Sequence, residues 1–280
     1  MKFKNFIKIF FAILFVFVST NSYAKTIKWS MQGDSLTLDP HAQNEGPTTQ
    51  VSRQVYEALV TRGLDMSIEP QLATDWKTTD PNTWIFNLRK DVKFSDGSNM
   101  TAKDVVFSIL RAKQPTSDFK EYISTISDVK EIDNYTVQIS TSKPNPIPLN
   151  QLSNIFIMSK KWSIDFGATV SQNWDGGEET FSATNAMGTG PFKITLREPN
   201  TKTVFERNSN WWGSMKDNSV TEIHLLPIKN SATRVAALLS GEVDLVTDAP
   251  VQDLARIGNS SDHEVVSTAQ MRTILSLIHI

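Results

Sequence analysis

The spacing of hydrophobic positions changes from segment to segment along the chain, which predicts a mixture of strands and helices. In NTWIFNLRKDVKF the residues Trp84, Phe86 and Leu88 occupy alternate positions, as in a half-buried strand. Strands are also expected at TIKWSM (26–31), TEIHLLPI and EVDLV. Because these segments alternate with helices that carry capping residues, we expect an α/β protein of the mixed α+β kind.

Apolar residues three or four positions apart predict helices between these strands. The first is expected to begin at about Thr48 and to stop at Gly63. The second begins with a capping box, in which Thr101 accepts backbone N–H bonds and Asp104 lies in the positively polarised first turn. The expected apolar faces are Val51, Val55 and Leu59 for the first helix, Val105, Val106, Ile109 and Leu110 for the second, and Val235, Leu238 and Leu239 for a third that starts at Ser231.

The first 24 residues have the layout of a secretory signal. Three lysines precede an apolar run at 9–18, and Ser22-Tyr23-Ala24 supplies small residues at the two positions that determine cleavage. The run is shorter than the ~20 residues that a membrane span needs. We therefore expect residues 1–24 to be removed, and the mature protein to begin at Lys25 and to be periplasmic.

Charge and cysteine content exclude several classes of protein. The chain has no cysteine, so it has no disulfide, no thiol nucleophile and no lipid-bearing cysteine. Its formal charge of −2 becomes −5 when the three lysines of the signal are removed. A mild acidic excess without a basic cluster argues against a nucleic-acid partner.

Two glycines flank a threonine in GTGPFKI (188–194), directly before an expected strand. A phosphate-binding loop would continue with Gly-Lys-Ser/Thr, whereas Pro191 and Phe192 follow here. The glycines are compatible with an anion-binding nest of backbone N–H groups. A tight corner, at which the backbone passes close to a neighbour, is the interpretation that we favour.

The histidines do not have the spacing of a metal site. None of the four, which are His41, His224, His263 and His279, lies three or four residues from another, so neither a metal nor a cofactor is expected. His224 alternates with Ile223 and Leu225 and is expected to face the opposite side of their strand.

Trp211 and Trp212 suggest a platform for stacking sugars. Adjacent residues of an extended chain point in opposite directions, so we expect one indole to be buried and the other to lie at the surface. Seven tryptophans and many carboxylates leave a second function open, that of a secreted hydrolase acting on glycans. Such an enzyme would hold a pair of carboxylates about 5–10 Å apart in one cleft.

Four segments of the chain resemble, in the same order, blocks of the bacterial extracellular solute-binding proteins of family 5, the peptide, opine and nickel group. They are LATDWKTTDPNTWIFNLRKDVKFSDGSNMTAKDVVFS (72–108), GTGPFKI, ERNSNWWG (206–213) and RVAALLSGEVDLV (234–246). The resemblance runs from about Thr26 to Ile274. It implies a monomeric periplasmic receptor without catalytic residues, which delivers a solute to an ABC import permease of the inner membrane by ligand-stabilised hinge closure.

The resemblance also implies a domain organisation of the periplasmic binding protein type II kind. Residues 25–58 and 187–270 would form the first lobe, 59–186 an additional subdomain, and 271–280 the start of a crossing to a second lobe. Members of the family continue for a couple of hundred residues, whereas this sequence ends in LSLIHI, which resembles translated sequencing adapter. We therefore expect an N-terminal fragment whose second lobe is missing through truncation.

Few loops of this lobe contact the ligand in the family. A zwitterionic peptide needs a carboxylate for its amino end and a cation for its carboxyl end, and each candidate is equally compatible with a solvated loop position. The class of solute stays open among peptides, opines, nickel complexes, haem and oligosaccharides. The ligand-binding residues implied by the resemblance are Asn44, Glu45 and Gly46 in NEGP, Thr247 and Asp248 after GEVDL, and Gln270 and Arg272 near the crossing.

Overall fold

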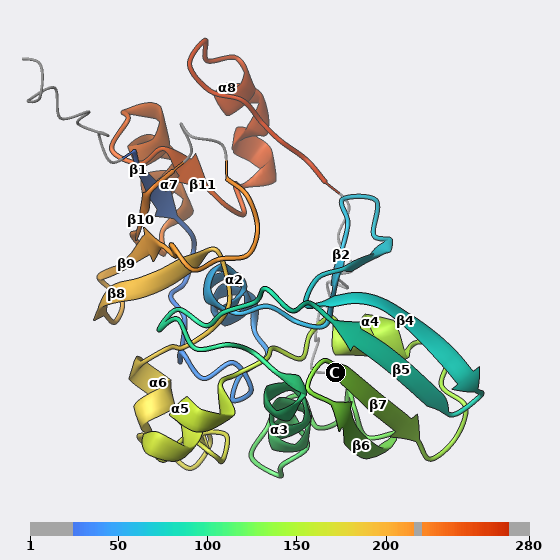
Figure 1. Cartoon of the computed structure of the whole chain (residues 1–280). Helices are drawn as coiled ribbons and strands as arrows, with labels where there is room; N and C mark the ends of the chain where they lie inside the picture. Colours follow the sequence, from blue (N-terminus) through green and yellow to red (C-terminus); the bar gives the residue numbers. More distant parts are fainter. Residues whose placement is uncertain (1–24, 216–219, 269–280) are drawn as a thin grey trace, which may run out of the picture.

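The computed structural model describes residues 25–215 and 220–268 (Figure 1). The expected signal at 1–24, the candidates Gln270 and Arg272 and the expected crossing at 271–280 lie outside the described residues. Within the described residues, no helix is both long enough and apolar enough to cross a membrane.

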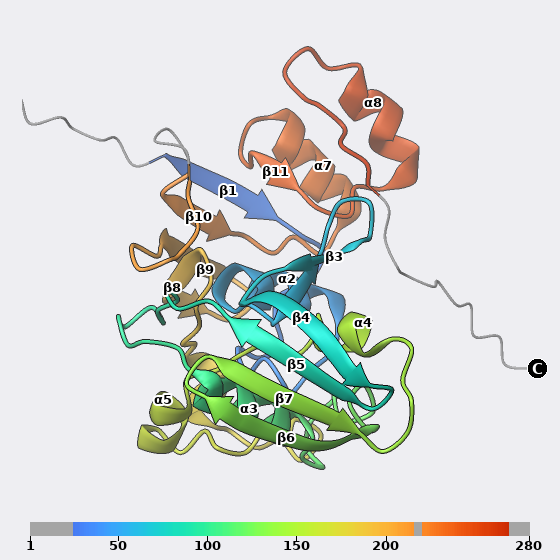
Figure 2. The same cartoon turned by 45° about the vertical axis from the view of Figure 1, so that its right-hand side comes forward.

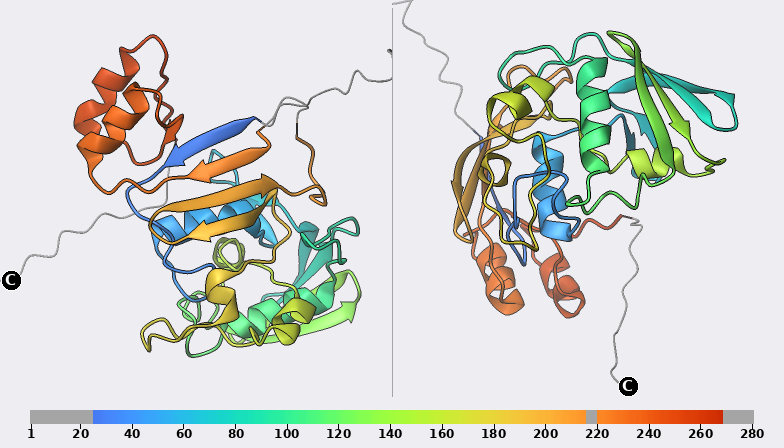
Figure 3. Two further views of the ribbon diagram at one scale, coloured as in Figure 1. Left: turned by 90° about the vertical axis from the view of Figure 1, so that its left-hand side faces the viewer. Right: turned by 90° about the horizontal axis from the view of Figure 1, so that it is seen from below.

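A five-stranded sheet has the strand order β11-β1-β10-β9-β8. Strand β1, the second in this order, is parallel to both of its neighbours, while β9 is antiparallel to β10 and to β8. Helix α2 covers one face of this sheet, where its Val51 and Val55 pack in one core with Trp29, Phe205 and Leu225 (Figure 3). The elements are β1 (Thr26–Ser30), α2 (Gly46–Val55), β8 (Phe192–Glu198), β9 (Lys202–Arg207), β10 (Glu222–Leu225) and β11 (Leu245–Val246).

A four-stranded antiparallel sheet of order β4-β5-β7-β6 forms a second layer (Figure 2). Helix α3 covers it, and Val105 and Ile109 of the helix share a core with Phe86, Val137 and Ile139 of the strands. A small hairpin, β2 with β3, stands beside this sheet. The bounds are β2 (Val60–Arg62), β3 (Ile68–Pro70), β4 (Ala73–Asp80), β5 (Thr83–Leu88), α3 (Ala102–Ala112), β6 (Ile126–Asp133) and β7 (Thr136–Thr141).

Short helices complete the described part of the chain. Helices α7 and α8 pack on one another through Val235, Leu238 and Ile257. Helix α7 connects β10 to β11, and these two strands lie on opposite sides of β1. The remaining bounds are α4 (Pro148–Leu152), α5 (Lys160–Asp165), α6 (Phe181–Thr184), α7 (Ser231–Leu239), η1 (Val251–Asp253) and α8 (Leu254–Gly258).

Two expectations about helices were wrong in detail. Helix α2 ends at Val55 rather than near Gly63, because Tyr56 turns to an extended conformation and Ala58 forms a bridge with Phe156. In α3, Leu110 is 50% exposed and does not belong to the apolar face. Its neighbour Arg111 is buried instead, through contacts described below.

The GTGPFKI segment is confirmed as a corner of close approach. A Cβ atom on Gly188 would lie 2.0 Å from the carbonyl oxygen of Val55, and one on Gly190 would lie 2.7 Å from the carbonyl carbon. The backbone N–H of Gly190 donates to that same oxygen at 2.8 Å. The segment thus satisfies a carbonyl that the end of α2 leaves without an intrahelical partner.

Candidate functional site

The carboxyl ends of β1 and β11 lie side by side, because the two strands are parallel and pair Ser30 with Val246. Thr247 follows β11 directly, and its backbone N–H donates to the carbonyl oxygen of Ser30 at 3.1 Å. Its hydroxyl accepts a hydrogen bond from the indole nitrogen of Trp29 at 3.2 Å. The candidate Thr247 is therefore fixed at this edge of the sheet by both its backbone and its side chain.

Asp248, the next candidate, has an exposed side chain and a left-handed backbone with φ 57°. Its carbonyl oxygen accepts a hydrogen bond from Nη2 of the buried Arg234 at 3.3 Å. Aspartate tolerates this backbone region better than most residues, because its short polar side chain bonds locally. The turn after β11 is thus held from α7 through the backbone of Asp248.

The candidates Asn44, Glu45 and Gly46 lie at the start of α2. Glu45 is the N-cap, and its Oε1 accepts the backbone N–H of Thr48 at 2.8 Å. The exposed Asn44 donates from Nδ2 to the hydroxyl of Tyr122 at 3.1 Å. Gly46 is exposed, and a Cβ there would meet no atom within 4 Å, so close packing does not require glycine at this position.

The loop between β1 and α2 places the two groups of candidates in the same part of the molecule. It leaves β1 beside Thr247 and then returns against the first turn of α2. There the backbone N–H of Leu36 donates to the hydroxyl of Thr48 at 2.9 Å, and Gly33 lies against the ring of Pro47. The structure therefore presents a carboxylate at Glu45 and another at Asp248 on loops that both border the end of β1.

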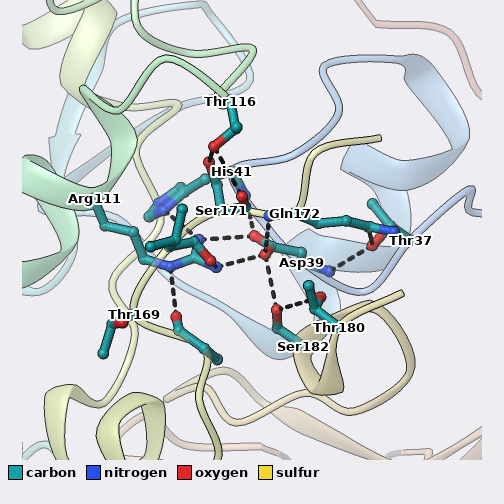
Figure 4. A network of polar contacts seen from close by, with 12 residues as sticks. Thr37, Asp39, His41, Arg111, Thr116, Thr169, Ser171, Gln172, Thr180 and Ser182 are labelled. Carbon is teal, nitrogen blue, oxygen red and sulfur yellow. Dashed lines mark hydrogen bonds and ion pairs between the residues drawn. The ribbon is translucent and has the colours of Figure 1, made fainter. Parts of the chain in front are cut away.

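A buried polar network lies under the same loop (Figure 4). The carboxylate of Asp39 accepts hydrogen bonds from Nη1 of Arg111 at 2.8 Å, from the backbone N–H of Gln172 at 3.1 Å and from the hydroxyl of Ser182 at 2.9 Å. Arg111 in turn donates from Nε to the carbonyl oxygen of Ala168 at 2.9 Å. Both charged side chains are completely buried. The network joins the loop before α2 to α3, so it connects the parts of the chain that carry the two sheets.

His41 belongs to this network and is neutral. Its Nδ1 lies 3.1 Å from Nη1 of Arg111, and a guanidinium only donates, so Nδ1 accepts and Nε2 carries the proton. Nε2 donates to the carbonyl oxygen of Phe156 at 2.9 Å. Burial, followed by the charge of Arg111, lowers the pKa of His41 to about 3. Burial alone would raise the pKa of Asp39, but the hydrogen bond and charge of Arg111 lower that pKa to about 2.

A second buried carboxylate, Glu57, corrects the expectation for the tryptophan pair. The indole N–H groups of Trp211 and Trp212 both donate to it, at 3.2 and 2.9 Å, and the hydroxyl of Thr189 donates at 2.8 Å. We expected one buried and one exposed indole, but both are half-buried and point toward Glu57. The reason is that the chain bends here instead of extending. A Cβ on Gly213 would lie 2.4 Å from the ring of Trp211, so glycine makes this bend possible.

These buried groups join distant segments of the fold. Burial raises the pKa of Glu57, and hydrogen bonds from Trp212, Thr189 and Trp211 oppose that rise. Sequence reasoning missed Asp39, Glu57 and Arg111, although one signal was present, since Arg111 falls within the buried stripe of α3. Within residues 25–215 and 220–268, no group of three or more histidine, aspartate or glutamate side chains is placed to hold a metal ion. His224 does face the side opposite to Ile223 and Leu225, where it contacts Glu222.

Comparison with protein families gives one match that covers about three quarters of the chain. The model of the bacterial extracellular solute-binding proteins, family 5 Middle, matches residues 67–277. Among curated proteins, the chain is 27% identical over 249 residues to the periplasmic oligopeptide-binding protein OppA of Escherichia coli K12, which covers 82% of this chain and 44% of that protein. It is 26% identical to the periplasmic murein peptide-binding protein MppA of the same organism, over 87% of this chain and 47% of that protein.

Solved structures show the same fold. The PBP AgaA of A. tumefaciens R10 in complex with agropinic acid is similar with a TM-score of 0.75 at 26% identity, over 84% of this chain and 46% of that chain. The PBP/SBP MoaA from the same source, in complex with mannopinic acid, has a TM-score of 0.72 at 28% identity, over 84% and 47%. The chain thus spans less than half the length of these relatives.

Proposed function

The chain belongs to the bacterial extracellular solute-binding proteins of family 5, and from this premise we propose that it is a periplasmic receptor for peptides or similar solutes. In this proposal it delivers the solute to an ABC import permease, works as a monomer and performs no catalysis. Solute bound between two lobes stabilises the closed arrangement that the permease recognises. The proposal includes removal of residues 1–24, which N-terminal sequencing of the exported protein checks.

The observation that carries this proposal is the position of the candidate loops. They border the carboxyl ends of two adjacent parallel strands, which is where open α/β sheets bind their ligands. The named relatives support the solute class, since their descriptions specify oligopeptides, a murein peptide and agropinic acid. OppA and MppA are both described as binding proteins, which gives no support to a glycan-acting hydrolase.

Within the receptor we propose the same division into parts that the sequence suggested. Residues 25–58 and 187–270 form the first lobe, and 59–186 form the subdomain. The two sheets support this division, because each draws its strands from one of the two parts. The parts are closely joined, since Phe156, Met158 and Trp162 pack in the core of the five-stranded sheet.

We propose that Glu45 binds the amino end of the solute, with Asn44, Gly46, Thr247 and Asp248 beside it. Its Oε1 is engaged by the helix cap, which leaves Oε2 for a cation. The ammonium group of a peptide is such a cation. Gln270 and Arg272 are retained as proposed ligand contacts at the crossing to the second lobe.

The change Glu45→Gln tests the role of this carboxylate, because glutamine keeps an oxygen for the cap but removes the charge. A hydrogen bond to a charged group contributes about 1.5–3 kcal/mol, so Kd for trialanine should rise about 10- to 100-fold. Isothermal titration calorimetry of the two-lobed protein measures this change, while the melting temperature should shift by no more than a few degrees.

Two controls accompany the experiment. Glu131→Gln removes an exposed carboxylate on β6 and should leave Kd unchanged. N-acetyl-trialanine lacks the ammonium group and should bind the wild type and Glu45→Gln with similar affinity. An unchanged Kd for trialanine in Glu45→Gln would rule out this role for Glu45, and a wild type that binds no peptide at all would contradict the receptor proposal.

A further inference from the structure

The solvent-exposed face of α2 leads from the candidate loop to an arginine. Gly46, Gln50 and Arg53 follow one another at spacings of four and three, so they lie on one face of the helix. Val51 and Val55 on the opposite face are buried against the sheet. At a rise of about 1.5 Å per residue, Arg53 lies roughly 12 Å along the axis from the cap residue Glu45.

The guanidinium of Arg53 is held by neutral groups. It lies 5.7 Å from the centre of the Phe156 ring, and Nη2 donates to Oδ1 of Asn154 at 3.4 Å. In the part of the chain that the structure describes, no carboxylate forms an ion pair with this exposed arginine. An arginine that stacks on a ring keeps its planar fork oriented, which prepares it to bind a carboxylate with two hydrogen bonds.

A second arginine contacts the same turn of the chain. Nη2 of Arg62 donates to the carbonyl oxygen of Asn150 at 3.3 Å, and that oxygen also accepts Nδ2 of Asn154 at 3.1 Å. One asparagine side chain therefore links the contacts of both guanidiniums. Desolvation, and then the charge of Arg62, lower the pKa of Arg53. An anion bound beside Arg53 would favour its charged form.

We propose that Arg53, with Arg62 and Asn154 beside it, binds the carboxylate of a solute whose amino end lies at Glu45. This inference rests on the proposed function and specifies its substrate class. An extended peptide advances about 3.3 Å per residue, so a separation of roughly 12 Å corresponds to about three residues or slightly more. The solute is accordingly a short peptide with a free carboxyl end, of about tripeptide length.

Calorimetric titration of the two-lobed protein with trialanine and with trialanine amide tests the inference. The amide keeps the amino end and the length but lacks the negative charge. Arg53→Met should raise Kd for trialanine about 10- to 100-fold, because it removes a charge-assisted hydrogen bond, and should leave Kd for the amide unchanged. Arg53→Lys keeps the charge without the fork and should fall between wild type and Arg53→Met.

Lys161→Met is the matched control, since it removes an exposed cation from α5. It should change neither Kd, and circular dichroism should show that all variants are folded. Equal loss of affinity for the acid and the amide in Arg53→Met, or no loss for either, would overturn the inference while leaving the receptor function intact. A wild type that binds neither peptide would overturn both.

Discussion

At the scale of single residues, the imidazole of His41 lies between a guanidinium that donates to it and a carbonyl oxygen that accepts from it. Protonation of Nδ1 would remove an acceptor and place a second cation beside Arg111. The folded protein therefore keeps His41 neutral to about pH 3, whereas the unfolded chain takes up a proton near the ordinary value of 6.5.

This difference predicts a pH dependence of stability. The contribution of His41 is fully present above pH 6.5 and is lost as the pH falls toward 3, at about 1.4 kcal/mol per pH unit. The raised pKa of Glu57 and of Asp104 acts in the opposite direction, since stability from those groups is lost as the pH rises. Urea unfolding of wild type and His41→Gln between pH 4.5 and 6 separates these effects, because the other groups are common to both proteins. The wild-type slope should exceed the variant slope by about 1.4 kcal/mol per pH unit, and parallel curves would contradict the assignment.

The corner at Gly190 gives a second prediction at this scale. An added Cβ would lie 2.7 Å from the carbonyl carbon of Val55, which is backbone and cannot move aside. Gly190→Ala should therefore lower the free energy of unfolding by about 1–3 kcal/mol, as overpacking in a tight site does. Gly46→Ala is the control, because nothing lies within 4 Å of its Cβ position, and it should unfold like the wild type. Equal urea midpoints for the two variants would show that the corner is not a tight contact.

At the scale of elements, α3 is tied to the loop before α2 by the buried pair of Arg111 and Asp39. Removing one partner leaves the other charge buried without compensation. Arg111→Met should therefore cost about 3–5 kcal/mol of unfolding free energy. The double variant Arg111→Met/Asp39→Asn should lose less unfolding free energy than the sum of the two single variants. The reason is that Asp39→Asn removes the buried charge that Arg111→Met leaves unpaired. Additive losses in a urea-unfolding cycle would mean that the two side chains act independently.

The same elements show what a sequence does and does not predict. Strands such as β5 and the capped start of α3 were predictable, because alternation and capping are local patterns. The end of α2 was not, because the chain after Val55 pairs with distant segments: Ala58 forms a bridge with Phe156, and Gly190 donates to the carbonyl of Val55. The orientation of Trp211 and Trp212 likewise depends on a distant partner, Glu57.

At the scale of the whole molecule, the family was predictable from four blocks of sequence, and the family match confirms it. The position of Glu45 in a loop was also predictable. That Glu45 caps α2, and that Arg53 lies farther along the exposed face of the same helix, could be seen only in the structure. Local patterns specify secondary structure, whereas the relation between two side chains on one helix face and a neighbouring turn depends on packing.

Native mass spectrometry of the protein purified from the periplasm tests the central claim most directly. A receptor for short peptides should carry a population of bound peptides, which should appear as additional masses of about three-residue peptides on the protein. Incubation with trialanine should replace them by a single mass. A protein that carries no peptide and acquires none from a mixture of di-, tri- and tetrapeptides would contradict the account.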